Sequence, residues 1–189
     1  MQAIKIRLIG LLCILICIGT PQYLLAQSRA NPQTTEARKE LREIYRSYLG
    51  VREKTGQNDG PFVEKFLRYT GLGKGYAWCA SFVCSCLGEA KISNPRSAWS
   101  PDLFPSKKVI YQPSKNKHEP PNTGDVLGIY FENKKRIAHA GFIDDWPKVG
   151  VYTFTVEGNT NEAGSREGDG VYAKRRLKKS IYAVSRWIN

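Results

Sequence analysis

The hydrophobic period of the chain changes near its middle, and this change constrains the fold more than any other feature. In the first half, apolar side chains recur every three or four positions in three segments, the spacing of helices with one buried face. In the second half, short runs rich in β-branched and aromatic residues follow one another at close intervals, as strands do. Helices first and antiparallel strands second predict an α+β fold.

Local signals set the boundaries of the predicted elements. The first helix has Thr34 or Thr35 as its N-cap and ends at Gly50. The second helix follows the turn Asn58-Asp59-Gly60-Pro61. Residues 92–122 are rich in proline, serine and lysine and are predicted to form a long surface loop. Strands are predicted over residues 125–131, 136–144, 151–157, 170–176 and 181–188.

A glycine-containing loop leads into the third predicted helix, which begins at Trp78 or Cys79 and ends at Gly88. The first turn of a helix favours negative charge, because its N–H groups lack intrahelical partners and the helix dipole is positive there. A thiolate at Cys79 would be stabilised in this place, and a nearby imidazolium can lower a thiol pKa from about 8.5 to roughly 3.5–7.5. Cys79 also falls on the apolar stripe of the helix, so the spacing fits a structural cysteine equally well.

Two histidines are available as partners for Cys79. His118 lies in the polar predicted loop, whereas His139 lies in a predicted strand between alanines, which leave room for a helix end to approach the ring. A strand histidine of this kind is also common as a core residue. On the following strand Glu157 and Asn159 lie two positions apart and therefore on one face. Either could orient the imidazole, or both could form a polar pair that faces water.

The first 26 residues differ from the rest of the chain. Lys5 and Arg7 precede an apolar run over residues 8–18, and Ala26 follows, an arrangement typical of a secretory signal peptide. The run is short for a membrane span, so we expect cleavage after Ala26 and no stable membrane anchor afterwards, with an uncleaved anchor as the alternative. A secreted or periplasmic protein is expected, with a linker over residues 27–33 and one domain over 34–189.

The net charge of the chain limits the classes of partner that it can bind. Without residues 1–26 the chain keeps 27 basic and 17 acidic residues, for a net charge of +10. This dispersed charge suits an anionic cell envelope, and we expect no nucleic-acid partner because no binding motif accompanies it.

Cys79, Cys84 and Cys86 are an odd number of thiols, so at least one is not paired within the chain. With two histidines and no Cys-x-x-Cys, we expect neither a metal nor a cofactor.

Four motifs, in this order, resemble those of the CHAP family in the NlpC/P60 superfamily. They are Trp78-Cys79-Ala80-x-Phe82-Val83, Thr123-Gly124-Asp125-Val126, Ala138-His139-Ala140-Gly141 and Val156-Glu157-Gly158-Asn159-Thr160. The resemblance implies a papain-like α+β fold, with N-terminal helices packed on a C-terminal antiparallel sheet or half-barrel. It also implies a cysteine peptidase or amidase that cleaves amide bonds of peptidoglycan, as an N-acetylmuramoyl-L-alanine amidase or a stem-peptide endopeptidase.

Matched residue by residue, the resemblance implies Cys79 as nucleophile, His139 as base, Glu157 as orienting acid and Asn159 as a fourth polar residue of the site. Two alternatives remain open: a wall-binding module without catalytic activity, and a cysteine amidase of the same fold that acts as an effector on a different amide. The aromatic residues that we expect to contact a substrate are Tyr76, Trp78 and Trp99.

Overall fold

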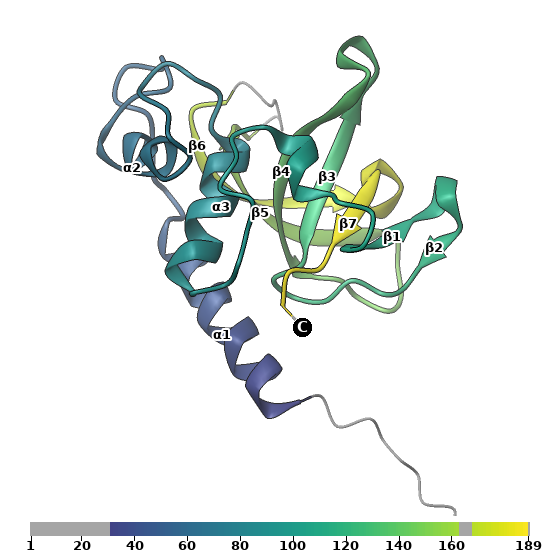
Figure 1. The fold of residues 1–189 in the computed structure, drawn as a ribbon. Coiled ribbons are helices and arrows are strands. Elements are labelled where there is room, and N and C mark those ends of the chain that lie inside the picture. Colours follow the sequence, from purple (N-terminus) through teal and green to yellow (C-terminus); the bar gives the residue numbers. More distant parts are fainter. Residues whose placement is uncertain (1–30, 163–167, 189) are drawn as a thin grey trace, which may run out of the picture.

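The computed structural model describes residues 31–162 and 168–188. In this part of the chain three helices precede all seven strands of an antiparallel sheet, which confirms the α+β prediction (Figure 1). The helices are α1 (Pro32–Ser47), α2 (Pro61–Tyr69) and α3 (Cys79–Glu89). The strands are β1 (Val109–Gln112), β2 (Lys117–His118), β3 (Val126–Phe131), β4 (Arg136–Asp145), β5 (Tyr152–Thr160), β6 (Gly170–Leu177) and β7 (Ala183–Ser185), in the sheet order β2-β1-β7-β3-β4-β5-β6.

Helix α1 begins earlier than predicted. Its N-cap is Asn31, whose side-chain oxygen accepts a hydrogen bond from the backbone N–H of Gln33 at 3.0 Å, and Pro32 occupies the first helical position. Asparagine is a stronger N-cap than threonine, and proline at the first position loses no helical hydrogen bond. The predicted linker over residues 27–33 is therefore wrong at its C-terminal end.

The predicted signal peptide, residues 1–26, lies outside the described residues. Within the described ranges, no helix has both the length and the apolar character needed to cross a membrane.

Residues 92–122 are not one long loop as predicted. They contain the 3-10 turn η1 (Ser100–Leu103) and the two short strands β1 and β2, and His118 lies exposed on β2. Strand β1 pairs with β7 near the C-terminal end of the chain. Because that partner is distant in the sequence, the local composition of this segment did not reveal the strand. Strand β7 is also shorter than the predicted 181–188.

Helix α3 is enclosed on all sides. Every residue from Cys79 to Leu87 is buried, because the helix packs against α1 and α2 as well as against strands β4 and β5. Strand β5 approaches it closely at Gly158, where an added Cβ would lie 2.7 Å from the Trp78 ring and 2.8 Å from the Phe82 ring. The first turn of α3 is therefore fixed against the strands that carry His139 and Glu157.

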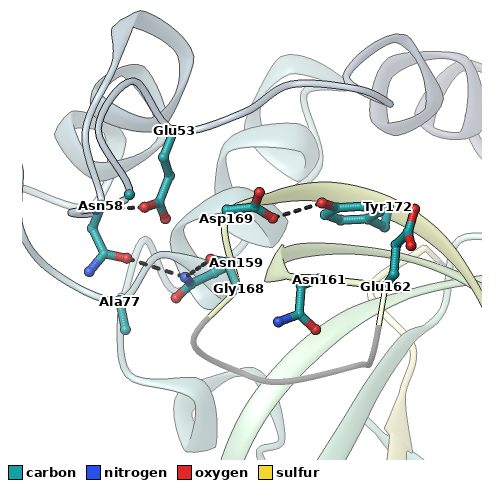
Figure 2. A pocket seen from close by; sticks show the side chains of 10 residues that line it. Glu53, Asn58, Ala77, Asn159, Asn161, Glu162, Gly168, Asp169 and Tyr172 are labelled. Carbon is teal, nitrogen blue, oxygen red and sulfur yellow. Dashed lines mark hydrogen bonds between the residues drawn. The ribbon is translucent and has the colours of Figure 1, made fainter.

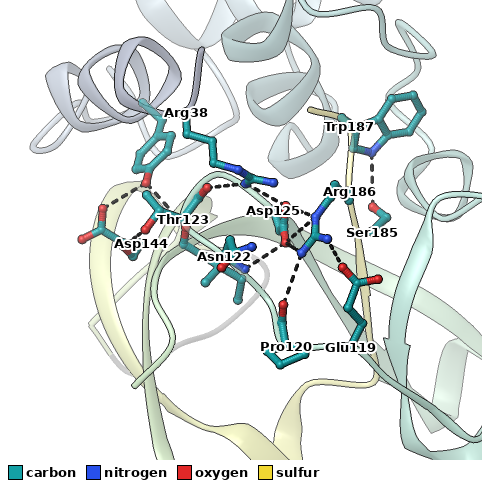
Figure 3. A network of polar contacts seen from close by, with 12 residues as sticks. Arg38, Glu119, Pro120, Asn122, Thr123, Asp125, Asp144, Ser185, Arg186 and Trp187 are labelled. Carbon is teal, nitrogen blue, oxygen red and sulfur yellow. Dashed lines mark hydrogen bonds and ion pairs between the residues drawn. The ribbon is translucent and has the colours of Figure 1, made fainter. Parts of the chain in front are cut away.

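A polar network ties α1 to the sheet (Figure 3). The fully buried Asp125, at the start of β3, accepts hydrogen bonds from Arg38 of α1 and from Arg186 near the C-terminus, each at 2.9 Å. At the far end of β4, Asp144 accepts a bond of 2.9 Å from Arg42 of α1. Removing one partner of a buried ion pair such as Arg38–Asp125 leaves an uncompensated charge and costs about 3–5 kcal/mol, whereas the half-exposed Arg42 contributes less. The buried pair in particular fixes α1 in place.

Candidate active site

Cys79 is the first residue of α3, as predicted, and its side chain is only 4% exposed. Trp78 is the N-cap and makes no side-chain capping hydrogen bond. The first-turn N–H groups and the positive end of the helix dipole therefore act on the thiol without a competing side-chain cap. The hydroxyl of Ser100, on η1, lies 3.6 Å from the sulfur. The helix N-terminus and the Ser100 hydroxyl both favour the ionised form of the thiol.

His139 is buried on β4, and an irregularity in the strand sets its direction. Ile129 pairs with His139 while Tyr130 pairs with Ile137, so Ala138 is an extra residue on β4. A bulge of this kind redirects the side chains beside it. The ring nitrogen Nε2 lies 2.7 Å from Oε2 of Glu157. The other nitrogen, Nδ1, is buried and meets no hydrogen-bond partner at good geometry among the described residues.

The Cys79 thiol and the His139 ring shift the pKa of one another. Burial opposes ionisation of the thiol, but the attraction of the nearby His139 outweighs it and lowers the pKa of Cys79 to about 7. Burial likewise opposes protonation of the ring, yet Cys79 and Glu157 raise the pKa of His139 to about 9. The thiol therefore loses its proton before the ring does. A thiolate and an imidazolium coexist between about pH 7 and pH 9.

The other two described cysteines contrast with Cys79. All three thiols are free, which agrees with the prediction that at least one of them is not paired within the chain. Burial raises the pKa of Cys84 to about 11 and raises that of Cys86 well above its ordinary value. Among these three described cysteines, only Cys79, at the helix N-terminus, has a histidine beside it and a lowered pKa.

Glu157 is fully buried, and basic and hydroxyl groups surround its carboxylate. Arg176 of β6 binds it with two hydrogen bonds, from Nε to Oε1 and from Nη2 to Oε2, each 2.5 Å long. The hydroxyl of Thr155 donates to Oε1 at 2.5 Å. Burial alone would raise the pKa of this carboxyl, but Arg176 and His139 lower it far below its ordinary value. Glu157 is therefore ionised throughout the working range of the site.

Gly141 explains how Glu157 reaches His139. It lies opposite Glu157 in the β4–β5 pair, since its neighbour Phe142 pairs with Val156. An added Cβ at Gly141 would lie 2.6 Å from Cγ of Glu157. Real Cβ atoms do not approach so closely, so the carboxylate keeps its position only while residue 141 has no side chain.

Asn159 does not share a face with Glu157, contrary to the prediction. Its φ of +55° is left-handed and breaks the alternation of β5. Its side-chain oxygen instead accepts the backbone N–H of Trp78 at 2.9 Å, and its amide donates to the carbonyl of Gly168 and to the side chain of Asn58 (Figure 2). Asn159 thus holds the backbone just before the nucleophile, and its bonds do not reach the His139 ring.

Of the three aromatic residues expected to contact a substrate, one is buried and two are exposed. Trp78 is fully buried, and its ring nitrogen donates to Glu53 at 2.8 Å, so the prediction that it contacts substrate is wrong. Its large apolar ring fills the space between α2 and β5, where Phe66 stacks on it. Tyr76 and Trp99 are 57% and 50% exposed, which leaves both free to meet a substrate.

No protein-family model, curated protein or solved structure matches the chain. What can be inferred about its function comes from the chemistry of the site. Within the described ranges, no group of three or more His, Cys, Asp or Glu side chains is arranged to hold a metal ion.

Sequence reasoning missed three polar residues of the site: Ser100, Thr155 and Arg176. Thr155 lies on the predicted strand face of Glu157, and this alternation was the one available signal. Arg176 reaches Glu157 only because β6 pairs with β5, and Ser100 reaches Cys79 only through the path of the segment 92–122. Cys79, His139 and Glu157 together match the arrangement of nucleophile, base and orienting acid that cysteine hydrolases need.

Proposed function

We propose that the protein is a secreted cysteine peptidase or amidase of papain-like fold that hydrolyses an amide bond of peptidoglycan. The observation that carries the proposal is the buried series Cys79, His139 and Glu157, in which the thiol pKa is lowered to about 7 while the imidazole pKa is raised to about 9. A wall-binding module has no use for a buried thiolate and imidazolium, which are costly to desolvate unless they serve chemistry.

In the proposed mechanism the Cys79 thiolate attacks the carbonyl carbon of the amide. The backbone N–H of Cys79, at the helix N-terminus, is placed to donate to the oxyanion. The imidazolium of His139 then gives its proton to the leaving amine, and a thioester remains. The neutral ring next takes a proton from water, which attacks the thioester and releases the acid. Glu157 accepts a hydrogen bond from the Nε2–H of His139 throughout and so keeps Nδ1 available for proton transfer.

Peptidoglycan is proposed as the substrate on two grounds. The four ordered motifs around Cys79, Asp125, His139 and Glu157 resemble those of the CHAP family, and the basic chain would be attracted to an anionic envelope after export. A cysteine amidase that acts on another amide uses the same site, so the substrate has to be decided by experiment.

Digestion of purified sacculi, followed by mass spectrometry of the soluble products, tests the proposal. New amino termini within stem peptides would identify an endopeptidase, and peptides released from the lactyl group would identify an amidase. Cys79→Ala serves as the inactive variant and Cys84→Ala as the matched control, because Cys84 is a free, buried thiol of the same helix. Sacculi that bind the protein without being cut would favour the wall-binding module. If Cys79 is reactive but the protein neither binds sacculi nor releases products from them, an amide outside peptidoglycan is favoured as the substrate.

A further inference from the structure

An exposed pair of side chains, Trp99 and Arg136, lies beside the candidate active site. The guanidinium carbon of Arg136 lies 3.8 Å from the centre of the Trp99 ring, a close cation–π stack. Trp99 is half exposed and Arg136 is partly exposed. The pair is therefore open to solvent and free to receive a ligand.

The positions of Trp99 and Arg136 along the chain place this pair near Cys79. Trp99 directly precedes Ser100, whose hydroxyl is 3.6 Å from the Cys79 sulfur. Arg136 begins β4 and comes three residues before His139, a separation of about 10 Å along a strand. Each member of the pair thus lies on an element that also supplies a residue of the site.

Arg136 keeps most of its hydrogen-bonding capacity. One of its five N–H groups donates to the carbonyl of Ile137 at 3.1 Å, and no carboxylate of the described residues lies within 4.0 Å of it. Stacking on Trp99 occupies the flat face of the guanidinium and leaves its edge free. By contrast, Arg176 and Arg186 are each bound by a carboxylate.

We infer that Trp99 and Arg136 form a substrate subsite for a carboxylate that lies close to the amide to be cleaved. A planar guanidinium binds a carboxylate through two parallel hydrogen bonds, and the indole face holds the guanidinium in place for this contact. The backbone separation of about 10 Å between Arg136 and His139 corresponds to about three residues of an extended peptide. The inference rests on the proposed function, because it names a chemical feature of the substrate of that same site.

The test compares native sacculi with sacculi whose carboxyl groups have been converted to amides by carbodiimide and ammonia. Wild-type protein is expected to cut the amidated material at least 10-fold more slowly. Arg136→Gln is expected to cut both materials at the same reduced rate. The matched control is Arg175→Gln, because Arg175 also stacks on an exposed aromatic ring, at 4.5 Å from Tyr152. It follows Lys174 and precedes Arg176 on β6, so its side chain points to the opposite face from the one that binds Glu157.

A second readout separates this inference from the proposed function. Native and amidated muropeptides, released by a muramidase, are tested for their ability to protect Cys79 from alkylation by iodoacetamide. Carboxylate-dependent protection that Arg136→Gln loses would support the subsite even if no amide were cut. Equal protection by both muropeptides, no protection by either, or a carboxylate preference that survives in Arg136→Gln would overturn the inference.

Discussion

Replacing Glu157 with glutamine removes the charge of the orienting acid while keeping an oxygen that can accept from His139. In the native site the pKa of His139 rises from 6.5 to about 9, which corresponds to about 3.4 kcal/mol at 1.36 kcal/mol for each pH unit. Burial opposes this rise, and Cys79 and Glu157 together overcome it, so their combined effect exceeds the net change. If Glu157 supplies about half of that effect, Glu157→Gln lowers the imidazole pKa by more than about one pH unit.

The loss of charge has a second effect through Arg176. Its guanidinium is 15% exposed and would remain beside the ring without its counter-ion, which further disfavours the imidazolium. A weaker imidazolium stabilises the thiolate less, so the thiol pKa rises above its native value of about 7. The two pKa values then move toward each other, and the thiolate–imidazolium pair is no longer the predominant form. We expect hydrolysis at pH 7.5 to fall roughly 10- to 100-fold.

The assay combines the pH dependence of Cys79 alkylation with the pH dependence of hydrolysis. Wild-type activity should rise with an apparent pKa of about 7 and fall with one of about 9, both belonging to the coupled pair. Thr155→Val is the matched control, because it removes a hydrogen bond to the same carboxylate and keeps the charge. An alkylation profile and a rate that stay at wild-type values in Glu157→Gln, with the fold intact by circular dichroism, would refute the role given to this residue.

Three further predictions follow from the geometry. Cys79→Ala should abolish hydrolysis without altering the fold, whereas Cys84→Ala should keep most activity; substantial turnover by the first variant would exclude the thiol mechanism. Asn159→Ala should lower the rate about 10-fold and leave the alkylation profile of Cys79 unchanged, since it frees the Trp78 backbone but not the ring; a shifted profile would contradict this assignment. Gly141→Ala should cost about 1–3 kcal/mol in the free energy of unfolding and lower activity, measured by chemical denaturation and hydrolysis, because the added Cβ meets Glu157. If the free energy of unfolding and the activity of Gly141→Ala both stay at wild-type values, β4 relaxes to accommodate the added Cβ.

The local parts of the structure could be predicted from the sequence. The apolar spacing and the loop around Gly75 placed the start of α3 at Trp78 or Cys79, and the strands of His139 and Glu157 were recognised from β-branched and aromatic content. These signals depend on neighbouring residues along the chain, which is why they needed no knowledge of the tertiary fold.

The parts that depend on distant pairing could not be predicted. Strand β1 forms against β7, and Arg176 meets Glu157 across the β5–β6 pair, so neither feature has a local pattern. Trp78 was misassigned for the same reason, because its burial follows from the approach of Gly158. The left-handed backbone at Asn159 also breaks the strict alternation on which its predicted direction depended.

Arg176 affects the ionisation of Glu157 and therefore how this carboxylate acts on His139. A fully buried carboxylate beside a histidine could take up a proton itself, and the site would then hold a neutral acid that cannot stabilise an imidazolium. Two hydrogen bonds from Arg176 keep Glu157 ionised, but the same positive charge opposes protonation of His139. The balance leaves the imidazole pKa at about 9, close enough to neutrality for the ring to give its proton to an amine and take one from water in the same cycle.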